Sequence, residues 1–260
     1  MFVDSHCHLN FPELRDRLPE IKAAMHEAQV DAAMVISTTI EEFPAVRALA
    51  EQEPAWWCTV GVHPDTEDLT EPDEAMLLEL AAHPKVVGIG ETGLDYYRLN
   101  GRSVADMEWQ RQRFRTHIRA ALRCGKPLVV HTRSASDDTL RILREEGAQA
   151  CGGVFHCFTE TAEVARAALD MGFHISFSGI LTFKNAQDLR DVAAWVPMDR
   201  MLIETDSPFL APVPYRGKVN QPSYVPQVAR QLAELRGLSV EDVAHQTTEN
   251  FNRLFDIPPQ

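Results

Sequence analysis

Eight short apolar runs recur along the chain, and each is followed by a polar or Gly/Pro break and then an amphipathic stretch. Several runs are almost continuous in Val, Ile, Leu or aromatic residues. This pattern is typical of strands in a parallel sheet, which are covered on both faces, and not of half-exposed strands with alternating polarity. The runs lie at residues 2–3, 32–37, 56–62, 86–90, 127–131, 152–156, 173–178 and 201–204.

The stretches between these runs carry apolar residues at helical spacing. One helix is predicted at 20–28, after Pro19, and two more at 108–125 and 138–147, which both end at a glycine. Strands that alternate with helices in this way, with no break in composition, favour a single α/β domain over residues 1–260, a (β/α)8 TIM barrel. A doubly wound open sheet is the alternative, but no GxGxxG motif follows the first strand.

The composition restricts the classes of partner. The 260 residues are 45% hydrophobic and carry a net charge of −13. An acidic chain disfavours broad binding of long duplex nucleic acid, because that affinity comes mostly from Lys and Arg residues that neutralise phosphates. A small phosphate-containing substrate held by a cation and a few basic residues is compatible with this charge.

The chain carries five cysteines without a CxxC motif, and its first residues do not resemble an export signal. No apolar run approaches the roughly 18 residues that span a membrane. We therefore expect a soluble cytoplasmic protein with reduced thiols, no membrane association and no obligate protein partner.

Histidine and carboxylate side chains stand at the carboxyl ends of the predicted strands. In a parallel barrel these ends meet on one face, where the active sites of such enzymes lie. Residues i and i+2 of a strand point to the same side, so His6 and His8 face the barrel mouth while Cys7 points away. Glu204 and Asp206 repeat this spacing on the last strand, which neighbours the first in a closed barrel. The strand-end residues are His6, His8, His63, Glu91, His131, His156, Glu204 and Asp206.

This donor set predicts a binuclear metal site. Imidazole and carboxylate ligands suit Zn, Mn, Fe or Ni, and also Mg where carboxylates and waters dominate. The donors are too many for one tetrahedral ion, so we expect two ions roughly 3.5–4 Å apart. The assignment is His6, His8 and Asp206 for the first ion, His131 and His156 for the second, and Glu91 as the bridge.

The same residues predict a hydrolytic mechanism. The expected nucleophile is a water or hydroxide that bridges the ions, with Asp206 accepting its proton as general base. His63 is expected to contact the substrate or leaving group, or else simply to form a hydrogen bond with the neighbouring loop. Glu204 is expected either to orient a ligand imidazole or to contact the substrate.

Basic residues near these strand ends are candidates for binding a phosphate. Arg133 follows His131 by two positions and therefore shares its side of the strand. Arg216 and Lys218 lie on a Pro-rich loop that is predicted to follow the last strand. They are further candidates for phosphate binding, and the alternative is that they are ordinary solvated loop charges.

Three stretches of the chain, FVDSHCHLN (2–10), PLVVHTRSASD (127–137) and MLIETDSP (201–208), resemble the signature sequences of the TatD family of metal-dependent hydrolases and deoxyribonucleases. GVHP, GETGLDYY and HCFT also occur in the order typical of that family. The resemblance spans essentially the whole chain and implies a TIM barrel related to the amidohydrolase superfamily. It implies metal-ligand roles for His6, His8, Glu91, His131, His156 and Asp206.

The resemblance also implies phosphodiester hydrolysis, often as a 3′ to 5′ exonuclease on DNA, and in other members deacylation of D-aminoacyl-tRNA. We expect a binuclear metal-dependent phosphodiesterase or deoxyribonuclease that acts on single-stranded or short nucleic acid, or on a small phosphodiester or ester. Mg or Mn is expected to support turnover, and Zn, Ni or Fe are the alternative ions. The alternative functions are a metal-dependent deacylase of an ester or amide and a non-catalytic metal-binding barrel.

Overall fold

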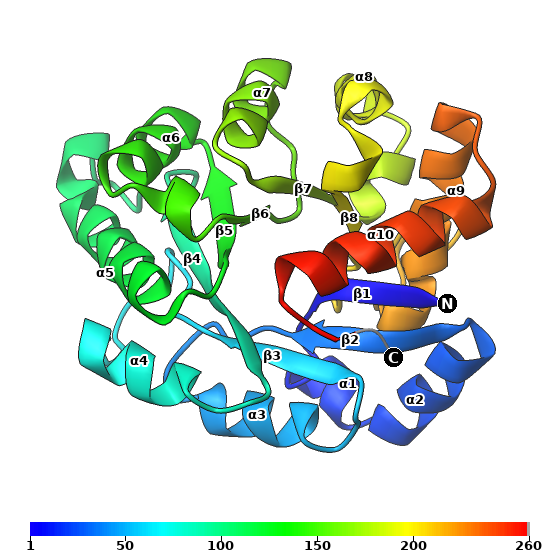
Figure 1. The fold of residues 1–260 in the computed structure, drawn as a ribbon, viewed down its shortest axis with the longest axis horizontal. Coiled ribbons are helices and arrows are strands. Elements are labelled where there is room, and N and C mark those ends of the chain that lie inside the picture. Colours follow the sequence, from blue (N-terminus) through cyan, green and yellow to red (C-terminus); the bar gives the residue numbers. More distant parts are fainter. Residues whose placement is uncertain (259–260) are drawn as a thin grey trace.

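The computed structural model describes residues 1–258, in which eight parallel strands follow one another around a barrel (Figure 1). Each strand pairs in parallel with the next one in chain order. The predicted (β/α)8 barrel is therefore confirmed, and β4 continues further beyond its apolar run than expected. The strands are β1 (Phe2–Cys7), β2 (Val30–Val35), β3 (Trp56–Val60), β4 (Val86–Asp95), β5 (Leu128–Arg133), β6 (Gly153–Phe155), β7 (His174–Phe177) and β8 (Met201–Ile203).

Helices surround the strands, and none of those within residues 1–258 is long and apolar enough to cross a membrane. The longest, α5, ends where Gly125 adopts a left-handed conformation, as its sequence predicts. The helices are α1 (Pro12–Arg15), α2 (Leu18–Glu27), α3 (Phe43–Ala50), α4 (Glu74–Ala81), α5 (Glu108–Cys124), α6 (Ser136–Glu145), α7 (Ala162–Asp170), α8 (Gln187–Trp195), α9 (Val225–Arg236) and α10 (Val240–Leu254). Short 3-10 helices lie at Val104–Met107, Ala148–Ala150, Gly179–Thr182, Met198–Arg200 and Pro222–Tyr224.

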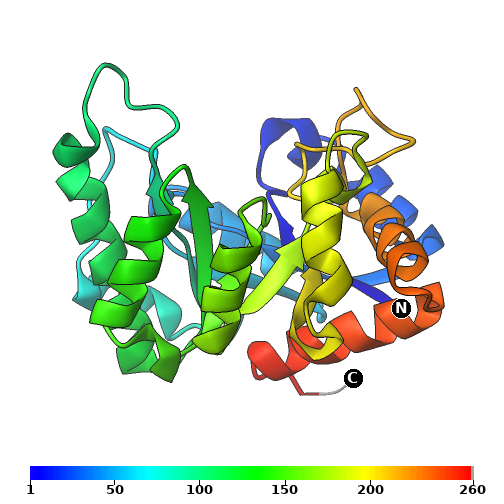
Figure 2. The same ribbon diagram turned by 90° about the horizontal axis from the view of Figure 1, so that it is seen from above.

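The strands are buried on both faces. A large apolar cluster packs between the strands and the surrounding helices. Inside the barrel a smaller cluster is completed by Phe251, Phe255 and Ile257, which come from α10 and the residues after it. Figure 2 shows α10 across one end of the barrel and long loops at the other end. The interior is therefore closed on the α10 side, which leaves the loop side for a site. The inner residues from the strands and their ends are Val3, Met34, Ile36, Val87, Val129, Val154 and Leu202.

Side chains close the seam between β8 and β1. Their backbone pairing within residues 1–258 is reduced to an isolated bridge from Cys7 to Ser207, which lies beyond the end of β8. The buried Asp4 carboxylate accepts the Thr205 backbone N–H at 2.9 Å and the Thr205 hydroxyl at 2.5 Å. Ser5 Oγ donates to the Ile203 carbonyl at 2.9 Å. These contacts hold the segment after β8 against β1, and that segment carries Asp206.

We expect Thr205→Val to lower the free energy of unfolding by about 1–3 kcal/mol, because a buried Asp4 oxygen would lose its hydroxyl donor. Thr247→Val is the matched control: Thr247 is equally buried, but its hydroxyl donates to a carbonyl of its own helix, α10. Its loss should cost less than about 1 kcal/mol. Denaturant unfolding of both variants measures the difference, and equal costs would contradict this role of the seam.

Candidate metal centre

A cavity of about 710 Å³ opens at the carboxyl ends of the strands. His6 is fully buried next to it, with its Nε2 atom 3.3 Å from His8 Nε2. Glu204, Arg216 and Lys218 do not line the cavity. The predicted site residues that do line it are His8, His63, Glu91, His131, Arg133, His156 and Asp206.

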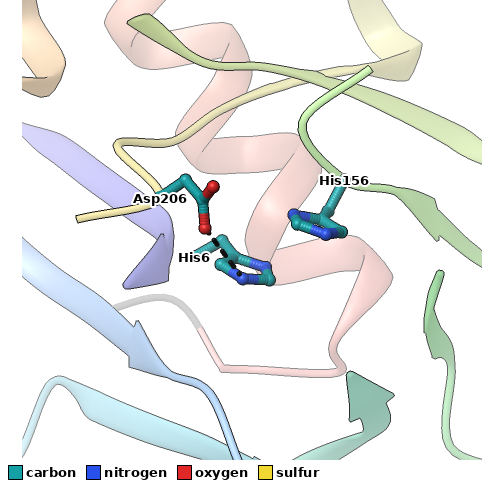
Figure 3. Close-up of side chains that lie close together, drawn as sticks. All are labelled: His6, His156 and Asp206. Atoms are coloured by element: carbon teal, nitrogen blue, oxygen red, sulfur yellow. Dashed lines mark ion pairs between the residues drawn. The ribbon is translucent and has the colours of Figure 1, made fainter. Parts of the chain in front are cut away.

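Four donor atoms form a first group in this cavity. His6 Nε2 lies 3.4 Å from Glu91 Oε2 and 3.5 Å from Asp206 Oδ1. His8 Nε2 lies 3.9 Å and 3.3 Å from the same two oxygens. Figure 3 shows His6 and Asp206 pointing toward each other. The structure thus brings together the three residues assigned to the first ion and one oxygen of the predicted bridge.

The other oxygen of Glu91 faces a second group of donors. Glu91 Oε1 lies 2.8 Å from His156 Nε2, 3.1 Å from His131 Nδ1 and 3.3 Å from His63 Nε2. One carboxylate therefore presents a separate oxygen to each group, which is the geometry that a bridging ligand needs. The His156 ring also stacks on that of His6, with centroids 3.9 Å apart (Figure 3), so its assignment to the second ion stays a prediction.

The first group fits a divalent ion. Ligand atoms around a tetrahedral ion bonded at about 2.0–2.1 Å lie about 3.4 Å from one another. The two imidazole nitrogens here lie 3.3 Å from each other and 3.3–3.9 Å from each of the two carboxylate oxygens. The Nε2 atoms of His6 and His8 face each other, so at most one of them can carry a proton there. Burial, helped by the charge on His156, lowers the pKa of His6, which keeps its ring neutral and able to coordinate a cation.

The charge of Glu91 depends on its neighbours. Burial alone would raise the pKa of this carboxyl, but the imidazoles of His156, His63 and His131 hold it well below its usual range. The pKa of Asp206 is likewise lowered against the effect of burial, first by a hydrogen bond from His8 and then by electrostatic interaction with the imidazoles around it, among them that of His156. Both carboxylates are therefore ionised and can serve as anionic ligands.

Glu204 supports His156 from behind. Its carboxylate is fully buried, and Oε1 lies 3.2 Å from His156 Nδ1 and accepts the Cys157 backbone N–H at 2.9 Å. A carboxylate in this position orients the imidazole and leaves its other nitrogen free for a ligand. This contact is consistent with the first of its two predicted roles, and Glu204 does not line the cavity.

Asp95 and Asp65 are two more carboxylates that contact an imidazole of the site, and they are not predicted from the sequence. Asp95 Oδ2 lies 3.1 Å from His131 Nε2, and Asp65 Oδ1 lies 2.5 Å from His63 Nδ1. Asp95 is four residues after Glu91 on β4, so strand alternation would have found it if β4 had been predicted to its full length. Asp65 lies beyond the end of β3, where no periodic rule applies.

The predicted basic residues take different positions. Arg133 lines the cavity, and its guanidinium lies 3.6 Å from the centre of the Tyr97 ring. Within residues 1–258 its guanidinium has no ion pair. Arg216 packs over Phe183 and donates to a loop carbonyl, and Lys218 lies on the same loop outside the cavity. Substrate binding by Arg216 and Lys218 stays a prediction that the cavity geometry does not support.

Two residues of α5 hold the segment that carries His63. The buried Arg113 donates to the carbonyls of His63 at 2.9 Å and Thr66 at 2.8 Å, and it pairs with Glu71. His117 Nε2 accepts the backbone N–H of Val62 at 3.0 Å. The position of His63 in the cavity wall is therefore fixed from outside the barrel.

Comparisons with known proteins find relatives that match nearly the whole chain. A family model described as TatD related DNase matches residues 3–256. The uncharacterized metal-dependent hydrolase YcfH of Escherichia coli K12 is 47% identical, over 98% of this chain and 96% of its own. The 3′-5′ ssDNA/RNA exonuclease TatD of Escherichia fergusonii is 32% identical, over 88% and 89%. The crystal structure of YjjV, a TatD homologue from Escherichia coli K12, matches with a TM-score of 0.89 and 28% identity, over 99% and 98%.

The buried His117 predicts a pH dependence of stability. Burial lowers its pKa from 6.5 to about 4, against a hydrogen bond to the Arg113 backbone carbonyl, and the Arg113 charge adds to the shift while Glu71 opposes it. Below pH 6.5 the unfolded chain binds a proton that the folded chain does not, so stability falls as the pH drops toward 4. Between pH 7 and 5 this residue should cost about 2 kcal/mol. The difference in unfolding free energy between wild type and His117→Gln should shrink by that amount from pH 7 to pH 5. The corresponding difference between wild type and His245→Gln, a variant at an exposed position, should be the same at both pH values.

We predict that Glu91→Ala and His131→Ala lose different amounts of bound metal. The wild type should bind about two ions per chain. Glu91→Ala should lose most of both, because Glu91 faces both donor groups, and His131→Ala should lose mainly one. His245→Ala, on the surface of α10, should keep the full content. Elemental analysis of folded protein measures this, and wild-type content in both site variants would refute the assignment.

Proposed function

Because the chain belongs to the TatD family of metal-dependent hydrolases, we propose that it is a phosphodiesterase that removes nucleotides from the 3′ end of single-stranded nucleic acid. The observation that carries this proposal is the Glu91 carboxylate, which presents one oxygen to each of two donor groups inside one cavity. A relative named as a 3′-5′ ssDNA/RNA exonuclease supports the choice of substrate. We propose two ions, Mg or Mn during turnover, held by the six predicted ligands.

Divalent ions held there would polarise a phosphoryl oxygen and lower the pKa of an attacking water. Asp206 lines the cavity as an ionised carboxylate and is the proposed acceptor of the proton from that water. His63 lines the same cavity with Nε2 toward Glu91 and is the proposed contact to the leaving group. Asp65, on the other side of its ring, fixes the orientation of this imidazole.

Arg133 is the proposed phosphate-binding residue. One face of its guanidinium lies on Tyr97, which holds the group in place while its edge stays available for hydrogen bonds. A guanidinium binds two phosphate oxygens in a planar fork, so it would fix a phosphodiester against the donor groups. This free cation in the wall of the cavity favours a phosphate over the carboxylic ester of an aminoacyl-tRNA.

The proposed activity is tested with metal-stripped protein reloaded with Mg, Mn or Zn. The substrates are an oligonucleotide labelled at its 5′ end, the same sequence as a duplex, and an aminoacyl ester. We expect stepwise shortening of the single strand, slower loss of the duplex and no turnover by metal-free protein. Turnover of the aminoacyl ester alone would assign the site to deacylation, and metal binding without any turnover would refute an enzymatic function.

Arg133→Gln should lower kcat/KM on the single-stranded substrate by about 10- to 100-fold, the worth of a hydrogen bond to a charged group. Its metal content should equal that of the wild type, because Arg133 belongs to neither donor group. Arg216→Gln is the matched control and should change kcat/KM by less than about twofold, because Arg216 lies outside the cavity. Equal losses in the two variants would show that general charge, and not the cavity position, matters.

A further inference from the structure

Phe209 is an exposed aromatic residue in the wall of the cavity. It is 52% exposed, whereas most of the large apolar residues described are buried or partly buried. Within residues 1–258, six other large apolar residues have comparable exposure, and none of them lines the cavity. An exposed Phe is ordinary on a protein surface, but one that faces a binding cavity is available to a ligand.

The backbone beneath this ring is held rigidly. The Phe209 N–H donates to the Asp206 carbonyl at 3.0 Å, which makes a tight turn directly after a predicted ligand. The fully buried Asn220 donates from Nδ2 to the carbonyls of Phe209 at 2.6 Å and Thr205 at 2.8 Å. The ring is thus exposed on a fixed backbone, so a ligand that packs on it has little ordering entropy to overcome.

A row of rings connects Phe209 to the first donor group. The Phe11 ring stacks on His8, with centroids 4.8 Å apart and planes at 20°. Phe209 meets Phe11 edge to face, with centroids 6.1 Å apart. Phe11 also lines the cavity. The apolar ring surface therefore begins at a predicted metal ligand and ends at the exposed face of Phe209.

We propose that Phe209, backed by Phe11, is the stacking surface for the nucleobase next to the hydrolysed phosphodiester. This proposal rests on the proposed function for the identity of the substrate. A phosphate held between the donor groups and Arg133 would leave its attached nucleoside to extend along the cavity wall toward these rings. Phenyl rings carry no hydrogen-bonding groups, so they accept any base, which suits an enzyme that removes successive nucleotides without sequence preference.

Binding of mononucleotides tests the surface without relying on turnover. The probes are dAMP and 2-deoxyribose 5-phosphate, measured by isothermal titration calorimetry on metal-reloaded protein. The wild type should bind dAMP about 5- to 100-fold more tightly than 2-deoxyribose 5-phosphate, which lacks the base. This is the usual range for base–aromatic stacking. Phe209→Leu should remove most of this preference, and Phe209→Trp should retain it. Val219→Ala, which changes an exposed residue of the same loop outside the cavity, should behave as the wild type.

The same variants are then compared on an oligonucleotide with a normal 3′ nucleotide and on one ending in an abasic residue. Phe209→Leu should have a higher KM than the wild type on the normal strand. On the abasic strand the two proteins should have the same KM. Equal preference for dAMP in wild type and Phe209→Leu would overturn the stacking proposal. A preference that depends on Phe209 in a protein that cleaves no oligonucleotide would retain the base site and refute the nuclease function instead.

Discussion

The site depends on the contact between the first and last strands of the barrel. His6 and His8 lie at the end of β1, and Asp206 lies about 200 residues later, beyond the end of a three-residue β8. So short a strand offers little backbone pairing, and the Asp4 carboxylate, bonded to Thr205, replaces the missing ladder. The Asp206 backbone N–H donates to the His6 carbonyl at 2.9 Å, so this seam itself sets the separation of the first donor group.

Glu91 makes the second constraint, because its two oxygens serve two groups of imidazoles. Burying several ionisable groups together is costly unless each is paired. The protein reduces this cost by placing a further carboxylate behind three of the rings, Asp65 behind His63, Asp95 behind His131 and Glu204 behind His156. The Nδ1 atoms of His6 and His8 have no such partner within residues 1–258, and burial lowers the pKa of His6. The other three rings are thus oriented by carboxylates of the protein itself.

The sequence predicts much of this arrangement because two simple rules apply where the strands are regular. Parallel strands gather their carboxyl ends on one face, and i, i+2 spacing turns His6 and His8 to one side. The rules fail beyond the strand ends. β8 stops at Ile203, so Glu204 and Asp206 no longer follow strand alternation, and Glu204 lies buried behind His156. Contacts made by loops, such as the one from Asp65 and the packing of Arg216 on Phe183, depend on backbone turns that no periodic pattern encodes.

The acidity of the chain and a polyanionic substrate are compatible only if attraction is confined to the cavity. A net charge of −13 repels nucleic acid at long range, and few phosphates could be neutralised at once. For the proposed nucleic-acid substrate, affinity would then come from divalent cations held by the donor groups, from Arg133 in the cavity wall and from uncharged surfaces such as the Phe209 ring. Such contacts would act over short range and would need a base that is free of its duplex partner. A site of this kind would favour strand ends and unpaired bases, because a continuous duplex offers neither a terminal phosphodiester nor an exposed base face.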